Sequence, residues 1–221
     1  MILYHGSQHI LEKPEFHGGR RHNDYGYGFY CTEFPDLARE WSASRDHDGY
    51  LNRYELDTKG LKILNLNEHG ILTWLTVLLE NRVFQIDTPL AQEATSYLIR
   101  EFHIDLEPFD IITGYRADDS YFSFARDFIS GALSLTQLKE VMHLGEMGDQ
   151  IVLKSERAHK RIRFLDHEEV DHEIWYAKRA ERDNKARNAY FKMNRMQYRK
   201  GELYMIRILD EEIKRDDARI Q

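Results

Sequence analysis

Short apolar runs, bounded by glycine, proline or charged residues, recur through the first 165 residues and alternate with segments whose apolar residues lie three and four apart. Short runs of this kind predict strands, and the wider spacing predicts amphipathic helices. The expected strands are 2–5, 29–32, 50–56, 61–66, 109–112, 150–154 and 162–165, and the expected helices are 36–44, 68–80, 90–102, 120–129 and 135–144. Strands and helices mixed in this order predict the α+β fold class.

The last quarter of the chain has a different pattern. Residues 170–200 are highly charged and predict one long helix, Gly201 interrupts it, and residues 203–213 predict a second helix. We therefore expect a domain over residues 1–167 and a charged helical tail over residues 168–221.

Composition narrows the class of protein. Hydrophobic residues make up 42% of the chain, which is enough for a core, so disorder is not expected. Cys31 is the single cysteine, which excludes an internal disulfide and a thiolate metal cluster. The first residues do not have the pattern of a signal peptide, and the most apolar stretch, 71–79, is too short to span a bilayer. A cytoplasmic protein without a membrane partner is expected.

The net charge of −7 is unevenly distributed. Residues 154–200 hold 14 Lys and Arg against 8 Asp and Glu, a local excess of +6. Such a segment is either the solvated face of a surface helix or a contact for nucleic acid or an acidic partner.

Three stretches contain residues suited to chemistry. In Tyr4-His5-Gly6-Ser7, an imidazole at a strand end can hydrogen-bond a ribose hydroxyl, and Gly6 allows a flat ligand to approach the backbone. A structural hydrogen bond is the alternative role for His5.

The second stretch, residues 24–32, is a glycine-rich turn that leads into a strand with several aromatic residues. A tyrosine at the end of such a strand can stack on nicotinamide, although core aromatics in a hairpin would give the same pattern. The third stretch, residues 145–153, places carboxylates and an amide on a turn before an apolar strand, which suits a site beside a sheet or an ordinary polar turn.

Together with residues 114–124, these stretches resemble the domain-of-unknown-function family 3990, a group of small prokaryotic proteins similar to ADP-ribosyltransferases. The matching segments are 4–7, 24–33, 114–124 and 150–155. The resemblance implies an ADP-ribosyltransferase-like split, mainly antiparallel sheet with flanking helices. It also implies that the domain binds NAD as a substrate and that no metal is needed.

The resemblance assigns individual roles by position. His5 would hold the nicotinamide ribose, Tyr30 would pack against nicotinamide, and Gln150 would hydrogen-bond the ribose 2′-hydroxyl. Further NAD contacts are expected from the residues around these positions, namely Gly6, Ser7, Tyr25 and Gly28.

Gln150 stands where ADP-ribosyltransferases usually have glutamate. An amide oxygen can accept a hydrogen bond but cannot supply negative charge to a developing cation. Three outcomes are open: a neighbour supplies the charge, the target's nucleophile supplies it, or the protein only binds NAD. Glu146 is the preferred neighbour, because Asp149 would point to the opposite face of the strand.

Three arginines could contact the ligand. Arg20 and Arg21 lie in the long glycine-rich loop of residues 6–28. They could bind the pyrophosphate of NAD, or they could be solvated. Arg116 precedes Asp118 and Asp119, which either cap the next helix or lie with Arg116 at the mouth of the site.

The leading expectation is an enzyme that cleaves the nicotinamide–ribose bond of NAD and transfers ADP-ribose to a protein or nucleic acid, or to water. A toxin neutralised by an antitoxin is an implied role. Two alternatives stay open: a non-catalytic module that binds NAD or ADP-ribose, and an interaction protein that acts through its basic helical tail. The stretches 166–169 and 171–173 resemble metal ligands but are expected to form the polar approach to the long helix.

Overall fold

The computed structural model describes residues 1–117, 119–142, 148–192 and 198–220, with residues 119–121 described by their backbone alone. Residue contacts divide the chain into two compact units. The first unit comprises Met1–Leu66, Asp105–Arg116 and Met147–Arg182, and the second comprises Asn67–Ile104, Ala117–Glu146 and Asp183–Gln221. Each unit is thus assembled from segments far apart in the sequence.

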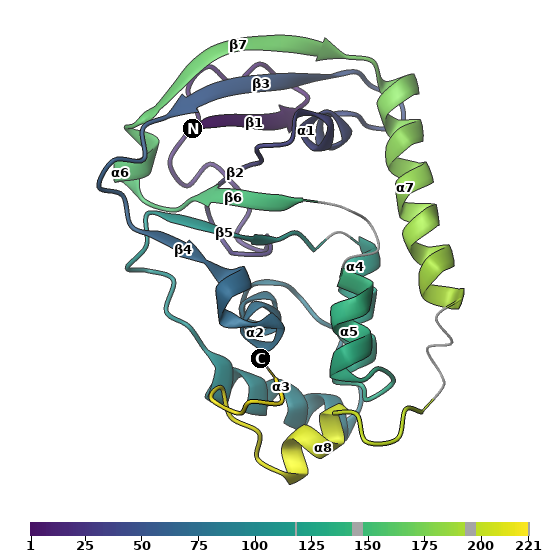
Figure 1. The fold of residues 1–221 in the computed structure, drawn as a ribbon. Coiled ribbons are helices and arrows are strands. Elements are labelled where there is room, and N and C mark those ends of the chain that lie inside the picture. Colours follow the sequence, from purple (N-terminus) through teal and green to yellow (C-terminus); the bar gives the residue numbers. More distant parts are fainter. Residues whose placement is uncertain (118, 143–147, 193–197, 221) are drawn as a thin grey trace. The chain divides into compact units, whose positions relative to one another are not determined.

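The first unit contains two sheets (Figure 1). The antiparallel sheet has the order β1-β3-β7, with bounds Ile2–Ser7, Gly49–Leu56 and Ile162–Val170. The mixed sheet has the order β2-β6-β5-β4, with bounds Phe29–Cys31, Asp149–Leu153, Ile111–Tyr115 and Ile63–Asn65. In the described part of the mixed sheet, β4 and β5 pair in parallel and the other neighbouring strands are antiparallel. An isolated bridge between Tyr4 and Thr32 connects β1 to the residue that follows β2.

Alternation along the strands produces one buried cluster in the first unit. Successive side chains point to opposite faces of a sheet. In β2 and β6 one face therefore presents Phe29, Cys31, Ile151 and Leu153, which are buried with Leu3 and Tyr54. Tyr30, Val152 and Gln150 lie on the other face, where the candidate site is found.

Short helices complete the first unit. Helix α1 (Pro35–Ser42) begins with a proline in its first turn and lies beside β1 (Figure 1). Helix α6 (Glu156–His159) begins at Ser155, whose hydroxyl accepts a hydrogen bond from the Ala158 N–H. Helix α7 (His172–Lys192) follows β7, and residues up to Arg182 belong to this unit.

The second unit is helical. It contains residues of the 3₁₀ turn η1 (Leu66–His69) and the later part of α7, together with α2 (Ile71–Asn81), α3 (Pro89–Phe102), α4 (Asp119–Ile129), α5 (Leu135–Met142) and α8 (Met205–Asp210). Residues 71–78 are buried in succession, and Thr88 caps α3 by accepting from the Ala91 N–H. Among the described residues no helix has the length and apolarity that crossing a membrane requires.

The expected α+β fold class is confirmed, with one antiparallel and one mixed sheet. The expected strand 162–165 is too short, because β7 continues to Val170 through Asp166 and Glu168, which form ion pairs with Arg53 and Arg39. These acidic residues therefore belong to an edge strand and not to an approach to the helix. Residue 167, the expected domain boundary, lies inside β7.

Candidate functional site

His5 lies near the end of β1, directly after the bridge between Tyr4 and Thr32. Its Nδ1 is 2.6 Å from the main-chain oxygen of Tyr30, and its ring centroid is 4.6 Å from that of Phe29. A carbonyl oxygen can only accept, so Nδ1 carries the proton and Nε2 is the acceptor. Burial lowers the pKa of His5, which favours this neutral form.

Tyr30, in β2, holds the preceding loop with its hydroxyl group. The hydroxyl donates to the Gly26 oxygen at 2.7 Å and accepts from the Tyr25 N–H at 3.0 Å. Its ring is half-buried, on the sheet face that also contains Gln150. The ring can therefore face a ligand while the hydroxyl stabilises the loop.

The glycine-rich loop is fixed at several other points. Tyr25 is fully buried and donates its hydroxyl to the Tyr115 oxygen at 2.6 Å. The Lys154 ammonium donates to the oxygens of Tyr25 and Tyr27 at 2.8 and 2.7 Å, and burial lowers its pKa. At Gly28 an added Cβ would overlap Val152, so the absence of a side chain lets the loop approach β6. Tyr25 and Gly28 thus have structural functions in this loop.

Gln150, in β6, is buried against a carboxylate. Its Nε2 donates to Asp24 Oδ2 at 3.0 Å and to the Tyr115 oxygen at 3.1 Å. Both side chains are almost inaccessible, with exposed fractions of 3% for Gln150 and 5% for Asp24. Asp24 could not be recognised as a site residue from the sequence, because nothing in its local pattern shows that it reaches β6.

Gly6 and Ser7 have neighbours that explain their identity. A Cβ on Gly6 would overlap the Ala38 oxygen of α1, so this glycine permits the helix to pack on β1. Ser7 Oγ accepts from Asn52 Nδ2 at 3.1 Å. Asn52 is fully buried in β3, and its Oδ1 accepts from the Leu11 N–H at 2.9 Å. Asn52 was also missed by the sequence analysis and organises the loop after β1.

The three candidate arginines lie in different surroundings. Arg20 and Arg21 are exposed in the loop, and neither forms an ion pair or side-chain hydrogen bond with the described part of the chain. Gly19, which precedes them, packs on the loop end, since a Cβ there would lie 2.6 Å from the Gly28 oxygen. Arg116 is half-buried, with its guanidinium carbon 5.0 Å from the centroid of the Trp41 ring. Trp41 is therefore a further aromatic residue near a candidate ligand contact.

The other carboxylates that the sequence singled out are only partly described. Glu146 and Asp118 lie outside the described residues, so their expected roles stay predictions. Asp149 is half-buried beside Gln150 in β6, and its main-chain oxygen accepts from Thr32 Oγ1 at 3.0 Å.

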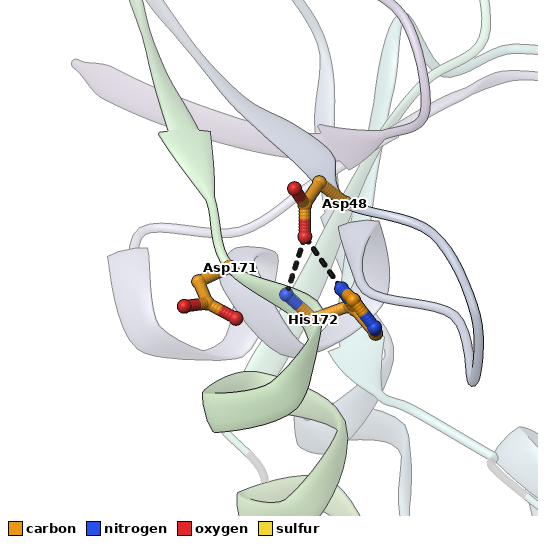
Figure 2. Close-up of side chains that lie close together, drawn as sticks. All are labelled: Asp48, Asp171 and His172. Atoms are coloured by element: carbon orange, nitrogen blue, oxygen red, sulfur yellow. Dashed lines mark hydrogen bonds and ion pairs between the residues drawn. The ribbon is translucent and has the colours of Figure 1, made fainter.

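A second polar cluster lies at the start of α7 (Figure 2). Asp48, Asp171 and His172 each offer one potential metal-ligand atom, and these atoms lie within 4.8 Å of one another. The same groups already form hydrogen bonds that cap the helix. Asp48 Oδ1 accepts from the His172 N–H at 2.9 Å and lies 2.6 Å from His172 Nδ1. Asp171 accepts from the Glu173 N–H at 2.8 Å. The amino end of a helix carries partial positive charge, which stabilises these carboxylates and disfavours a cation.

The fold and the site define an α+β protein in which a histidine of β1 contacts the main chain of a tyrosine in β2, and a buried glutamine of β6 is paired with an aspartate of the loop that precedes β2. A family model described as "Protein of unknown function (DUF3990)" matches residues 1–164, and the chain belongs to this family. No curated protein and no solved structure matches the chain.

Proposed function

We propose that the chain binds NAD and cleaves its nicotinamide–ribose bond, transferring ADP-ribose to a macromolecule or to water. One observation carries the proposal: a chain of hydrogen bonds joins the expected site residues. The His5 ring bonds the main-chain oxygen of Tyr30, and the Tyr30 hydroxyl accepts from the Tyr25 N–H. The Tyr25 hydroxyl in turn donates to the main-chain oxygen of Tyr115, which also accepts from the Gln150 side chain. Residues distant in sequence are thus held in one network.

Each of these residues has a proposed role. His5 accepts a ribose hydroxyl at Nε2, because Nδ1 donates to Tyr30. Tyr30 presents its half-buried ring to nicotinamide, and Gln150 accepts the 2′-hydroxyl at Oε1. The exposed guanidinium groups of Arg20 and Arg21 are suited to the pyrophosphate.

The reaction breaks the bond between C1′ of the ribose and the nicotinamide nitrogen. The bonding pair leaves with nicotinamide, which becomes neutral, and positive charge develops at C1′. A lone pair of the acceptor then forms the new bond to C1′, and the acceptor loses a proton. A toxin-like role with a neutralising antitoxin, in a cytoplasmic protein, belongs to the same proposal.

A non-catalytic module that binds NAD or ADP-ribose is the second candidate. The amide of Gln150 favours it, because this residue carries no charge to stabilise a cation at C1′. A module of this kind would bind NAD with the same residues and release no nicotinamide.

Incubation of the purified chain with NAD, followed by measurement of free nicotinamide and of NAD affinity by calorimetry, tests both candidates. His5→Ala is expected to weaken binding and to lower release about 10-fold or more, since a ribose contact is lost. The matched control is His9→Ala, an exposed histidine that follows the same strand. Binding without release would favour the module, and wild-type affinity in His5→Ala would show that the site is elsewhere.

A further inference from the structure

Asp24 and Gln150 form a buried pair of a carboxylate and an amide, 126 positions apart in the sequence. A buried carboxylate is costly unless hydrogen bonds and the local field compensate for lost hydration. The surrounding loop is nevertheless built to hold Asp24 in this place. Asp24 lies in a turn in which the Gly26 N–H donates to the Asn23 main-chain oxygen at 3.0 Å. Tyr25, the residue directly after Asp24, is held through its N–H, its main-chain oxygen and its hydroxyl.

The hydrogen bonds also fix the orientation of the Gln150 amide. Its NH₂ group has two donors, which are directed to Asp24 Oδ2 and to the Tyr115 oxygen. The remaining polar atom, Oε1, is the acceptor. A hydrogen bond to a charged acceptor polarises the amide, so Asp24 makes Oε1 a stronger acceptor than that of an isolated glutamine.

We infer that Asp24 is a positioning residue that acts through Gln150, and that the pair performs the two tasks of a single glutamate. Gln150 accepts the ribose hydroxyl, and Asp24 supplies the negative charge that stabilises the cation developing at C1′. This inference rests on the proposed function. A fixed charge close to a developing cation in a poorly hydrated site is among the largest contributions to enzymatic rate.

The arrangement predicts a specific result when the two groups are exchanged. Asp24→Asn keeps an acceptor for Gln150 and removes the charge. Gln150→Glu adds a carboxylate beside Asp24, and the two groups then share a proton, because like charges this close do not both ionise. The double variant Asp24→Asn/Gln150→Glu again has one amide and one carboxylate, with the charge transferred to β6.

The test measures nicotinamide release, the KM for NAD and thermal stability in wild type and these three variants. Asp24→Asn is expected to lower kcat about 10- to 100-fold, with KM changed less than about threefold and near-wild-type stability. Gln150→Glu alone is expected not to exceed wild type, and the double variant is expected to recover at least tenfold over Asp24→Asn. Glu12→Gln is the control, since Glu12 is an exposed carboxylate of the same loop.

Several outcomes would overturn the inference and leave the proposed function intact. The first two are a wild-type kcat in Asp24→Asn and a kcat far above wild type in Gln150→Glu alone. The other two are a double variant whose kcat does not recover, and a loss of kcat in Glu146→Gln that Asp24→Asn does not show. If Asp24→Asn fails to fold, the kcat of Gln150→Glu relative to wild type still tests the inference, because a large rise would overturn it. A wild-type protein that releases no nicotinamide overturns both proposals.

Discussion

The ring of His5 in β1 and the main chain of Tyr30 in β2 are linked directly, with His5 Nδ1 2.6 Å from the Tyr30 oxygen. The contact lies beside the bridge that connects the two sheets, between Tyr4 and Thr32. It determines which nitrogen of His5 carries the proton, and it holds the imidazole next to the strand that carries Tyr30.

The first prediction concerns acid stability. Burial lowers the folded-state pKa of His5 below the unfolded value of about 6.5. The unfolded chain therefore binds more protons at this position, and stability is lost as pH falls from about 7 through the folded-state pKa. NMR titration should place the His5 pKa below about 6.5. His5→Asn should flatten the pH dependence of the unfolding free energy relative to the wild-type protein. A slope in His5→Asn equal to that of the wild type would contradict the prediction.

The second concerns the Tyr30 hydroxyl. Tyr30→Phe keeps the ring but removes the partner of Tyr25 and Gly26. We expect it to lower the unfolding free energy by about 1–3 kcal/mol, the cost of leaving such groups unsatisfied. Tyr27→Phe, at a tyrosine 41% exposed in the same loop, should change it by less than about 0.5 kcal/mol. Denaturant unfolding checks both. Tyr30→Ala should weaken NAD binding more than Tyr30→Phe does, and calorimetry can compare them.

The third concerns the start of α7. The hydrogen bond that the His172 ring donates to Asp48 raises the pKa of His172, and the bonds from the His172 N–H and ring lower the pKa of Asp48. A raised folded-state pKa stabilises the protein fully below the unfolded value of about 6.5, and this contribution is lost as pH rises through the folded value. NMR should show a His172 pKa above 6.5 that falls in Asp48→Asn. Asp46→Asn, at an exposed position in the same loop, is the control. An unchanged His172 pKa in Asp48→Asn would refute the assignment.

The fourth concerns truncation after residue 167. Such a chain lacks the end of β7, where Val170 is buried with Ala38 and Leu51. It also lacks Arg182, whose side chain forms a mostly buried ion pair with Glu40 at 2.8 Å. We expect a lower melting temperature or aggregation, because an apolar contact and a charge partner are lost together. A truncated chain that melts like the full one would instead support a separable tail.

The sequence predicted much of the local structure correctly. The helix expected over residues 36–44 corresponds to α1, and the short apolar runs over residues 50–56 and 150–154 indicated β3 and β6. The sequence underestimated the length of β7, because an edge strand with ion-paired charges lacks a continuous apolar pattern. Within the candidate site, the resemblance of the sequence to its family indicated His5, Tyr30 and Gln150, because it assigns roles to these positions.

The sequence by itself therefore determined the periodicity of the strands and helices, the α+β class and the stretches that could contain a site. It could not determine that Asp24 contacts Gln150 or that Asn52 holds the loop after β1, because these pairs depend on which strands are neighbours and in which register. Neighbouring strands are selected by burial of apolar surface over the whole unit, a sum to which each local segment contributes little. Only the tertiary structure decided that a carboxylate from the glycine-rich loop lies beside the amide of β6.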